Sequence, residues 1–196
     1  MVEYGISTLS IIPGRNEPAD AAEQVTQLLF GEFYQVKEVR KTWIKIQTVY
    51  DNYECWIDLK QHYPISDKYA QRLLKQKFIS VSLEVVGLLT QVDSRSIIPI
   101  MAGSSLPFYK DGECNIDGVK YHFDGQALLK ADKKNHLALI NHAELYVNTP
   151  YLWGGRHPFG IDCSGFTQIC YKMIGVAIPR DAVSYTHLRA HETESN

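Results

Sequence analysis

Residues 161–175 read Ile-Asp-Cys-Ser-Gly-Phe-Thr-Gln-Ile-Cys-Tyr-Lys-Met-Ile-Gly. From Phe166 onward, apolar residues recur at i, i+3, i+4, i+7 and i+8, which is the pattern of an amphipathic helix. Gly175 suits the C-terminal cap of that helix. The stretch therefore predicts a helix that begins at Cys163 and buries one face.

Cys163 is a candidate nucleophile because of its place at the helix start. Unpaired amides and the helix dipole favour a thiolate there. A thiolate attacks carbonyls without a metal, and the same amides can help to stabilise an oxyanion. The alternative is that Cys163 is a small core residue, as Cys170 in the same helix is expected to be.

Before residue 132, the sequence pattern predicts short strands with turns between them. Residues 43–47 (Trp-Ile-Lys-Ile-Gln) alternate apolar and polar side chains, the period of a half-buried strand. Three Asp-Gly dipeptides, which begin at Asp111, Asp117 and Asp124, fit tight hairpins. Residues 13–20 predict a long loop. Such spacing is typical of small β barrels or sandwiches.

Two helices are expected outside the strand regions. Residues 66–77 predict a short connector helix with Ser66 or Asp67 as its N-cap. Residues 136–147 predict a second helix. The string Ser-Ile-Ile-Pro occurs at residues 10–13 and again at 96–99, which indicates two related β modules before the second helix.

Composition excludes several classes of function. The chain has 196 residues, with 20 Lys and Arg against 22 Asp and Glu, so no basic excess exists to bind nucleic acid or an anionic membrane. No apolar run is long enough to span a membrane. The four cysteines form no C-x-x-C pair, and we expect neither a metal nor a cofactor. The N-terminus lacks a signal-peptide pattern, which favours the cytoplasm, or an extracytoplasmic place if the N-terminus is trimmed.

Three motifs in the last third of the chain occur in a fixed order. They are Tyr-Leu-Trp-Gly-Gly at 151–155, Asp-Cys-Ser-Gly-Phe at 162–166 and Ile-Pro-Arg-Asp at 178–181. Together they resemble the NlpC/P60 family of cysteine peptidases. The β modules resemble bacterial SH3-like (SH3b) domains. The combination is similar to γ-D-glutamyl-L-diamino-acid endopeptidases of cell-wall peptide turnover.

The resemblance implies an α+β fold with two small SH3-like β-barrels followed by a truncated papain-like NlpC/P60 catalytic domain. The expected divisions are residues 1–65 for the first SH3-like domain, 66–77 for the connector, 78–131 for the second SH3-like domain, 132–182 for the N-terminal half of the catalytic domain and 183–196 for an atypical tail.

The resemblance also implies the reaction and the residues that perform it. Cys163 would attack the γ-D-glutamyl carbonyl of a peptidoglycan-derived peptide, L-Ala-γ-D-Glu-L-diamino acid, and Tyr151 would help to bind the oxyanion. Hydrolysis would fall at the γ-D-Glu–L-diamino acid bond. The expected substrate-binding residues are Asp162, Ser164, Trp153, Arg180, Asp181, Glu23 and Tyr53.

The two residues from the first β region have competing interpretations. Glu23 and Tyr53 match positions that contact the N-terminal L-Ala, whose ammonium group needs a carboxylate. Glu23 is equally consistent with a solvated loop charge. Tyr53 is equally consistent with an aromatic side chain that packs on the sheet.

The sequence departs from the family after residue 182. The family's base and its orienting residue lie on later strands, but the only histidines after Cys163 are His187 and His191, in a segment that does not resemble the family. We therefore expect a truncated gene model with an artefactual tail. The polypeptide is predicted to be inactive because it lacks this base, and to be poorly soluble because the apolar face of the Cys163 helix would be exposed.

Two other classes of function remain open at this stage. One is a non-catalytic SH3b module that binds muropeptides or cell wall. The other is an acyltransferase on a related cysteine fold, which the motif alone does not exclude. A nucleophile at a helix start favours the enzyme over the binder.

Overall fold

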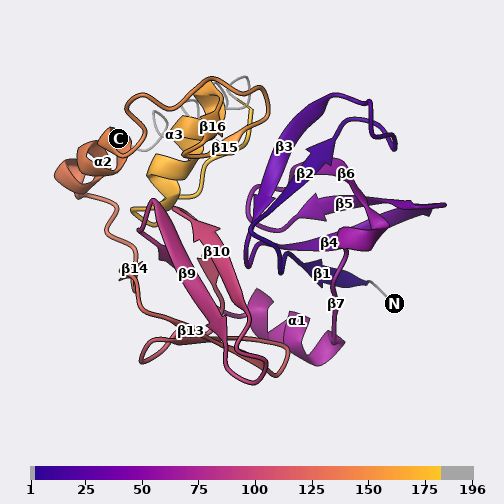
Figure 1. Cartoon of the computed structure of the whole chain (residues 1–196), viewed down its shortest axis with the longest axis horizontal. Helices are drawn as coiled ribbons and strands as arrows, with labels where there is room; N and C mark the ends of the chain where they lie inside the picture. The colour runs from indigo at the N-terminus through magenta and orange to yellow at the C-terminus, as the bar shows by residue number, and fades with distance from the viewer. Residues whose placement is uncertain (1–2, 182–196) are drawn as a thin grey trace, which may run out of the picture.

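The computed structural model describes residues 3–181 of the chain. Strands dominate the described part, and its α-helices follow or connect them (Figure 1). The first β unit, residues 4–65, is a seven-stranded antiparallel sheet in the order β3-β2-β6-β5-β4-β1-β7. Its strands are β1 (Tyr4–Ile6), β2 (Ile11–Arg15), β3 (Gln24–Leu29), β4 (Phe33–Arg40), β5 (Trp43–Thr48), β6 (Glu54–Asp58) and β7 (Pro64–Ile65), with a 3-10 turn at Leu59–Gln61.

The alternation in β5 forms as the sequence predicts. Ile44, Ile46 and Thr48 are buried, whereas the residues between them are partly exposed. The buried isoleucines join a core made by residues from β2, β3, β4 and β6. A period of two places one face of the strand in this core, which fixes the register of the sheet.

The long loop predicted over residues 13–20 is wrong in its first part. Pro13 and Gly14 lie within β2, and Pro13 is opposite Gln27 of β3. Strand β2 pairs with β6 only at Arg15, and the register with β3 shifts between Gly14 and Arg15. Proline is tolerated at such unpaired edges and bulges, so the loop begins only after Arg15.

Helix α1 (Asp67–Leu74) forms the predicted connector. Ser66 caps it, because the Ser66 hydroxyl accepts the Tyr69 amide. Tyr69, Ala70 and Leu73 are buried in a core that also takes residues from both sides of the helix. Figure 1 shows α1 between the seven-stranded sheet and the strands that follow. The connector is thus part of a shared core.

The second β unit, residues 80–128, contains two small sheets. One has the order β10-β9-β13-β12 and the other the order β11-β8-β14. The strands are β8 (Ser80–Ser82), β9 (Val86–Gln91), β10 (Ile97–Met101), β11 (Ser105–Leu106), β12 (Glu113–Ile116), β13 (Val119–Phe123) and β14 (Ala127–Leu128).

Two of the three Asp-Gly dipeptides form tight turns. Asp111 and Asp117 and the glycine after each have positive φ, as a type I′ turn requires, and the Asp117 turn joins β12 to β13. The hairpin predicted at Asp124 is wrong. Neither Asp124 nor Gly125 is among the positive-φ residues, and the chain there passes from β13 to β14 in the other sheet.

The last described elements are α2 (His136–Glu144), β15 (Arg156–His157), β16 (Gly160–Ile161) and α3 (Cys163–Lys172). The predicted stripe on α3 is buried: Ile169, Cys170, Met173 and Ile174 are at most 3% exposed. Ile169, Cys170 and Met173 share a core with Leu29 of β3, against which residues of α2 pack. The expectation that this face is exposed is therefore wrong, because the first β unit and α2 cover it.

Helix α2 ends at Glu144, three residues before the predicted end at residue 147. Leu139 and Ala143 pack against the α3 core. Leu137 and Ile140 are 68% and 56% exposed. Only one side of this short helix contacts α3, which leaves these two apolar side chains at the surface.

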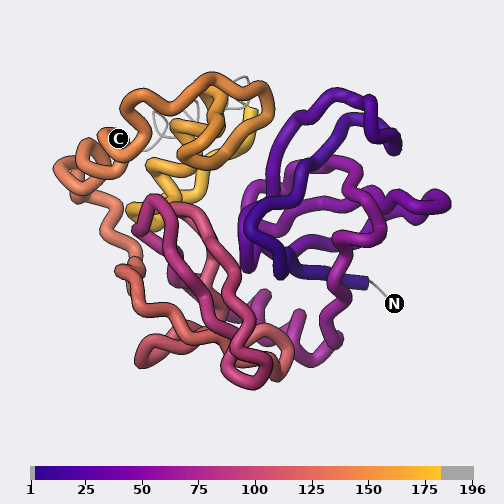
Figure 2. Tube along the Cα trace, viewed as in Figure 1, coloured from indigo at the N-terminus to yellow at the C-terminus, as the bar shows by residue number. Residues whose placement is uncertain are grey.

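The two β units and the C-terminal segment contact one another directly. Gly31, with φ of 76°, lies so close to Ser105 that a Cβ atom would be 2.0 Å from the Ser105 carbonyl oxygen. The trace in Figure 2 shows the segment before α3 beside the β2–β3 hairpin, and Gln24 Nε2 donates to the Trp153 carbonyl there. The start of α3 is thus held against β3.

Candidate active site

Cys163 is the first residue of α3, and its side chain is exposed. Asp162 is the N-cap: its Oδ1 accepts the Gly165 amide at 2.6 Å. The other cysteines, Cys55, Cys114 and Cys170, are buried. The structure thus presents one thiol to solvent, at the N-terminus of a helix, where backbone amides lack partners within the helix.

Arg180 holds the cap in place. Its Nη2 lies 2.6 Å from Asp162 Oδ2 and its Nη1 lies 3.1 Å from Asp162 Oδ1. Nη1 also donates to the Ser164 hydroxyl at 2.6 Å, and Nε donates to Thr26 Oγ1 on β3 at 3.2 Å. Arg180 is only 2% exposed. The guanidinium group therefore joins both neighbours of Cys163 to the first β unit.

Asp162 is ionised in this setting. Burial alone would raise its pKa, but hydrogen bonds from Arg180 and the Gly165 amide lower it below the usual range. Asp162 Oδ2 also accepts the Gly154 amide at 2.9 Å. One carboxylate thus fixes both the helix start and the glycine turn before it.

The glycine turn at Gly154 and Gly155 fits against two backbones. Gly154 has φ of 73°, and a Cβ there would be 2.7 Å from the Gln24 carbonyl oxygen of β3. A Cβ on Gly165 would be 2.3 Å from the Gly155 carbonyl oxygen. Only glycine permits these approaches, so the motif spacing reflects close packing of the turn, β3 and α3.

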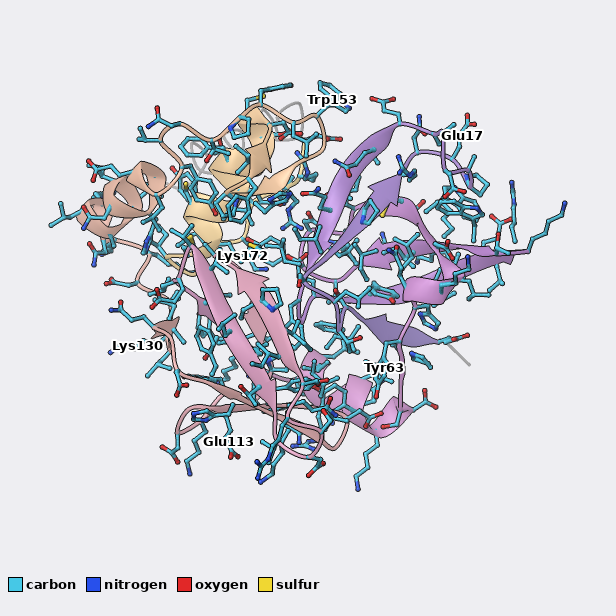
Figure 3. The ribbon with its side chains drawn as sticks, in the orientation of Figure 1. Glu17, Tyr63, Glu113, Lys130, Trp153 and Lys172 are labelled. Atoms are coloured by element: carbon cyan, nitrogen blue, oxygen red, sulfur yellow. The ribbon has the colours of Figure 1, made fainter. Side chains whose placement is uncertain are left out.

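Tyr151 and Trp153 flank this turn and are exposed by 66% and 57%. Tyr151 forms a parallel bridge with Ile161, two residues before Cys163. Figure 3 shows Trp153 at the top of the molecule, near β3. Both aromatic side chains are thus accessible to solvent.

The remaining predicted residues are Tyr53, Asp181 and Glu23. Tyr53 is half-buried and packs against the core of the first β unit. Burial, and to a smaller extent the charge of Asp181, raise the pKa of Tyr53 to about 12. Asp181 is exposed. Glu23 directly precedes Gln24, and its Oε2 accepts Asn16 Nδ2 at 3.3 Å.

Sequence reasoning missed several polar residues that support the site. Gln27 of β3 accepts from Arg156, and Asp51 Oδ2 accepts Gln168 Nε2 of α3 at 2.7 Å. Thr26 contacts Arg180 as described above. None of these residues belongs to a motif, and each contact joins segments more than 100 residues apart. The sequence carried no signal for them.

No histidine within residues 3–181 hydrogen-bonds the Cys163 thiol. His157 accepts the Phe159 amide at Nδ1, and burial lowers its pKa and that of His142. His187 and His191, and the predicted tail, lie outside the described residues. In the same range no group of three or more His, Cys, Asp or Glu side chains could hold a metal, and no helix is long and apolar enough to cross a membrane.

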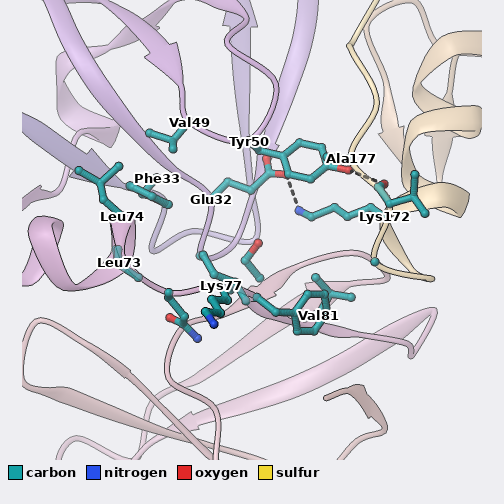
Figure 4. A pocket seen from close by; sticks show the side chains of 17 residues that line it. Glu32, Phe33, Val49, Tyr50, Leu73, Leu74, Lys77, Val81, Lys172 and Ala177 are labelled. Carbon is teal, nitrogen blue, oxygen red and sulfur yellow. Dashed lines mark hydrogen bonds and ion pairs between the residues drawn. The ribbon is translucent and has the colours of Figure 1, made fainter. Parts of the chain in front are cut away.

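A cavity of about 350 Å³ lies apart from the thiol, where the first β unit, α1 and the segment after α3 meet (Figure 4). Its wall is largely apolar and includes Phe33, Leu73 and Val81. Glu32 and Lys172 form an ion pair on this wall. None of the predicted site residues lines it.

Comparison with known proteins gives two family matches. Residues 14–61 match the bacterial dipeptidyl-peptidase SH3 domain, and residues 148–196 match the NlpC/P60 family. The chain is 28% identical over 192 residues to dipeptidyl-peptidase 6 of Lysinibacillus sphaericus, which covers 85% of this chain and 68% of that protein. It is 50% identical over 44 residues to a gamma-D-glutamyl-L-lysine dipeptidyl-peptidase of Bacillus cereus, 22% of this chain and 13% of that protein.

Solved structures show the same fold. An NlpC/P60 family protein from Bacillus cereus aligns with a TM-score of 0.80 at 18% identity, over 94% of this chain and 76% of that one. An NlpC/P60 endopeptidase from Photobacterium damselae aligns with a TM-score of 0.70 at 16% identity, over 92% and 45%. The α+β class and the predicted resemblance are confirmed.

Proposed function

We propose that this chain, which joins a bacterial SH3 domain to an NlpC/P60 segment, is the substrate-binding and nucleophile-bearing part of a cysteine peptidase. The proposed bond is the one between γ-D-Glu and the L-diamino acid in peptidoglycan-derived peptides with a free N-terminal L-Ala. The observation that carries the proposal is the exposed thiol of Cys163 at the N-terminus of α3, capped by Asp162.

The arrangement supports acyl transfer. A Cys163 thiolate would attack the γ-glutamyl carbonyl and form a C–S bond, and the charge on the carbonyl oxygen would meet the amides of the helix start. Tyr151, exposed beside Ile161, is the proposed side-chain donor to that oxygen. The C–N bond then breaks as the amine leaves with a proton, and water hydrolyses the thioester. The proton carrier would have to come from outside residues 3–181.

Two exposed carboxylates, those of Asp181 and Glu23, suit a peptide with a free amine. The L-Ala ammonium group requires a carboxylate, and Asp181 and Glu23 are the proposed partners because neither has an arginine or lysine ion pair among the described residues. Asp162 is already paired with Arg180. We therefore propose that Asp162, Ser164 and Arg180 shape the pocket.

The 196-residue polypeptide is proposed to bind its peptide without efficient turnover. Catalysis by cysteine needs a base within hydrogen-bond reach, and no histidine of the described residues contacts Cys163. That same observation favours the second candidate, a muropeptide-binding module without chemistry. The two candidates differ in whether the thiol reacts.

The test combines binding, hydrolysis and thiol reactivity. The polypeptide is titrated with L-Ala-γ-D-Glu-L-Lys and its meso-diaminopimelate analogue by calorimetry, and release of L-Ala-γ-D-Glu is followed by mass spectrometry. Cys163→Ala is the matched control. Binding with fast alkylation of Cys163 supports the peptidase. Binding with an unreactive thiol favours the module, and no binding of either peptide contradicts both.

Rapid hydrolysis that Cys163→Ala abolishes would support the peptidase and overturn the proposed inactivity. An N-acetylated tripeptide tests the amine. It should bind much more weakly than the free peptide, because the acetyl group removes the charge that Asp181 and Glu23 are proposed to meet.

A further inference from the structure

Glu32 is a buried carboxylate in the turn between β3 and β4 that meets two cations from the C-terminal segment. Its Oε1 lies 2.6 Å from Lys172 Nζ and 3.0 Å from Arg156 Nη2, and its Oε2 lies 2.8 Å from Arg156 Nη1. Oε2 also accepts the Leu29 amide at 2.9 Å. Each side chain of this ionic cluster, Glu32, Arg156 and Lys172, is at most 4% exposed. Figure 4 shows the Glu32–Lys172 pair on the cavity wall.

Arg156 and Lys172 bracket the nucleophile. Arg156 follows the glycine turn and begins β15, and its Nη1 also donates to the Gln27 carbonyl at 2.6 Å. The Cγ of Arg156 lies 3.3 Å from the position of a Cβ on Gly165, so its stem packs against the first turn of α3. Lys172 is the last residue of the same helix. One carboxylate thus holds both ends of the segment that carries Cys163.

The charges of the cluster depend on one another. Burial alone would raise the pKa of Glu32, but the two cations lower it to about 2. Burial lowers the pKa of Lys172, and the charge of Glu32 opposes that effect. Removing one partner from such a buried pair leaves an uncompensated charge. The resulting loss in the free energy of unfolding is larger than the stabilisation that the intact pair provides.

We propose that Glu32 is a positioning residue, through which the first β unit sets the place of the Cys163 helix and the glycine turn. The proposal rests on the proposed function, since it concerns the same nucleophile. Glu32 lies in the SH3-type region and contacts neither the thiol nor any predicted substrate-binding residue. The SH3-type region would thus position the nucleophile as well as contact the substrate.

Three variants test the proposal. Glu32→Gln removes the charge and keeps the shape. Glu32→Gln with Lys172→Met removes one charge of each sign, so the net charge of the cluster is unchanged. Leu89→Ala, in the core shared with the second β unit, is the matched control, because it also destabilises the protein but lies in a core that contains no residue of α3.

The readouts are the rate of Cys163 alkylation by iodoacetamide, under conditions in which each variant is folded, and the amide NMR signals of Gly154, Gly155 and Gly165. We expect both Glu32 variants to react about threefold or more slowly than the parent and to shift these amides. Leu89→Ala should retain the parent rate and signals. The charge-balanced variant, Glu32→Gln with Lys172→Met, should recover thermal stability but should not recover the alkylation rate of the parent.

A parent rate and parent amide signals in Glu32→Gln would overturn the proposal, and so would their return in the charge-balanced variant, because Glu32 would then only neutralise charge. These outcomes do not depend on hydrolysis. If Cys163 of the parent is unreactive, the proposed peptidase function fails, and the three amide signals still decide the role of Glu32.

Discussion

Arg180 and Asp162 form a buried two-point ion pair: Nη2 lies 2.6 Å from Oδ2, and Nη1 lies 3.1 Å from Oδ1. Asp162 is at once the N-cap of α3, the acceptor of the Gly154 amide and the partner of Arg180. Because Asp162 directly precedes Cys163 and Arg180 also reaches β3, this pair couples the helix start to the first β unit.

Asp162→Asn removes the charge of Asp162 but keeps a side chain that can cap α3, so it tests how much the charge alone contributes to stability. Asparagine still caps α3, but Arg180 becomes a buried cation without its anion, so we expect a loss of about 3–5 kcal/mol in the free energy of unfolding. Asp162→Ala should lose about 1 kcal/mol more, for the cap. Urea unfolding measures both. Glu38→Gln, at the exposed pair with Arg40, is the control and should cost at most about 1 kcal/mol.

Stability should fall as the solution is acidified through the folded pKa of Glu32. That pKa is lowered to about 2, whereas an unfolded glutamate titrates near about 4.3. Between these values the unfolded state binds more protons, so the stabilisation is complete above about pH 4.3 and is lost toward pH 2. Its size is on the order of 3 kcal/mol.

Urea unfolding between pH 2.5 and 7 checks this dependence. The lowered pKa of Asp162 adds to it with the same sign. Glu32→Gln should show a shallower fall than the parent. An identical slope in the two proteins would mean that Glu32 does not titrate with folding, contrary to the geometry of the ionic cluster.

Gly165→Ala should destabilise the protein although alanine is the better helix former. The new Cβ would lie 2.3 Å from the Gly155 carbonyl oxygen, and overpacking of this kind costs about 1–3 kcal/mol. Gly118→Ala is the control: it has φ of 97° but open space around it, so only backbone strain of about 1 kcal/mol applies. Thermal unfolding compares the two. A gain in stability for Gly165→Ala would contradict the close approach of the turn.

Cys163 should be the one cysteine that iodoacetamide modifies in the folded protein. Burial raises the pKa of Cys114 and of Cys170 to about 12 and that of Cys55 further, which keeps these thiols protonated as well as inaccessible. Peptide mapping after brief alkylation at neutral pH should find one label. Cys163→Ser should remove it, and equal labelling of Cys114 would show that the β core opens.

The helix that bears Cys163 could be predicted because its signals are local. The apolar stripe from Phe166 to Ile174 and the terminal Gly175 lie within one short segment, where periodicity and cap chemistry determine the structure. The alternation of β5 and the turn at Asp117 were predictable for the same reason. By contrast, Pro13 in β2 and the exposed Leu137 of α2 depended on which neighbours the strand and helix found.

The sequence by itself thus determined α3, the alternation of β5 and the turn at Asp117, since these depend on neighbouring residues. The tertiary structure alone decided that Glu32 is buried against Arg156 and Lys172, 124 and 140 residues away, and that Arg180 reaches Thr26 across 154 residues. The sequence around a charged residue does not indicate which distant residue it will pair with. Its burial follows from how the β units and α3 pack, which is why the framework of the site became visible only in the folded chain.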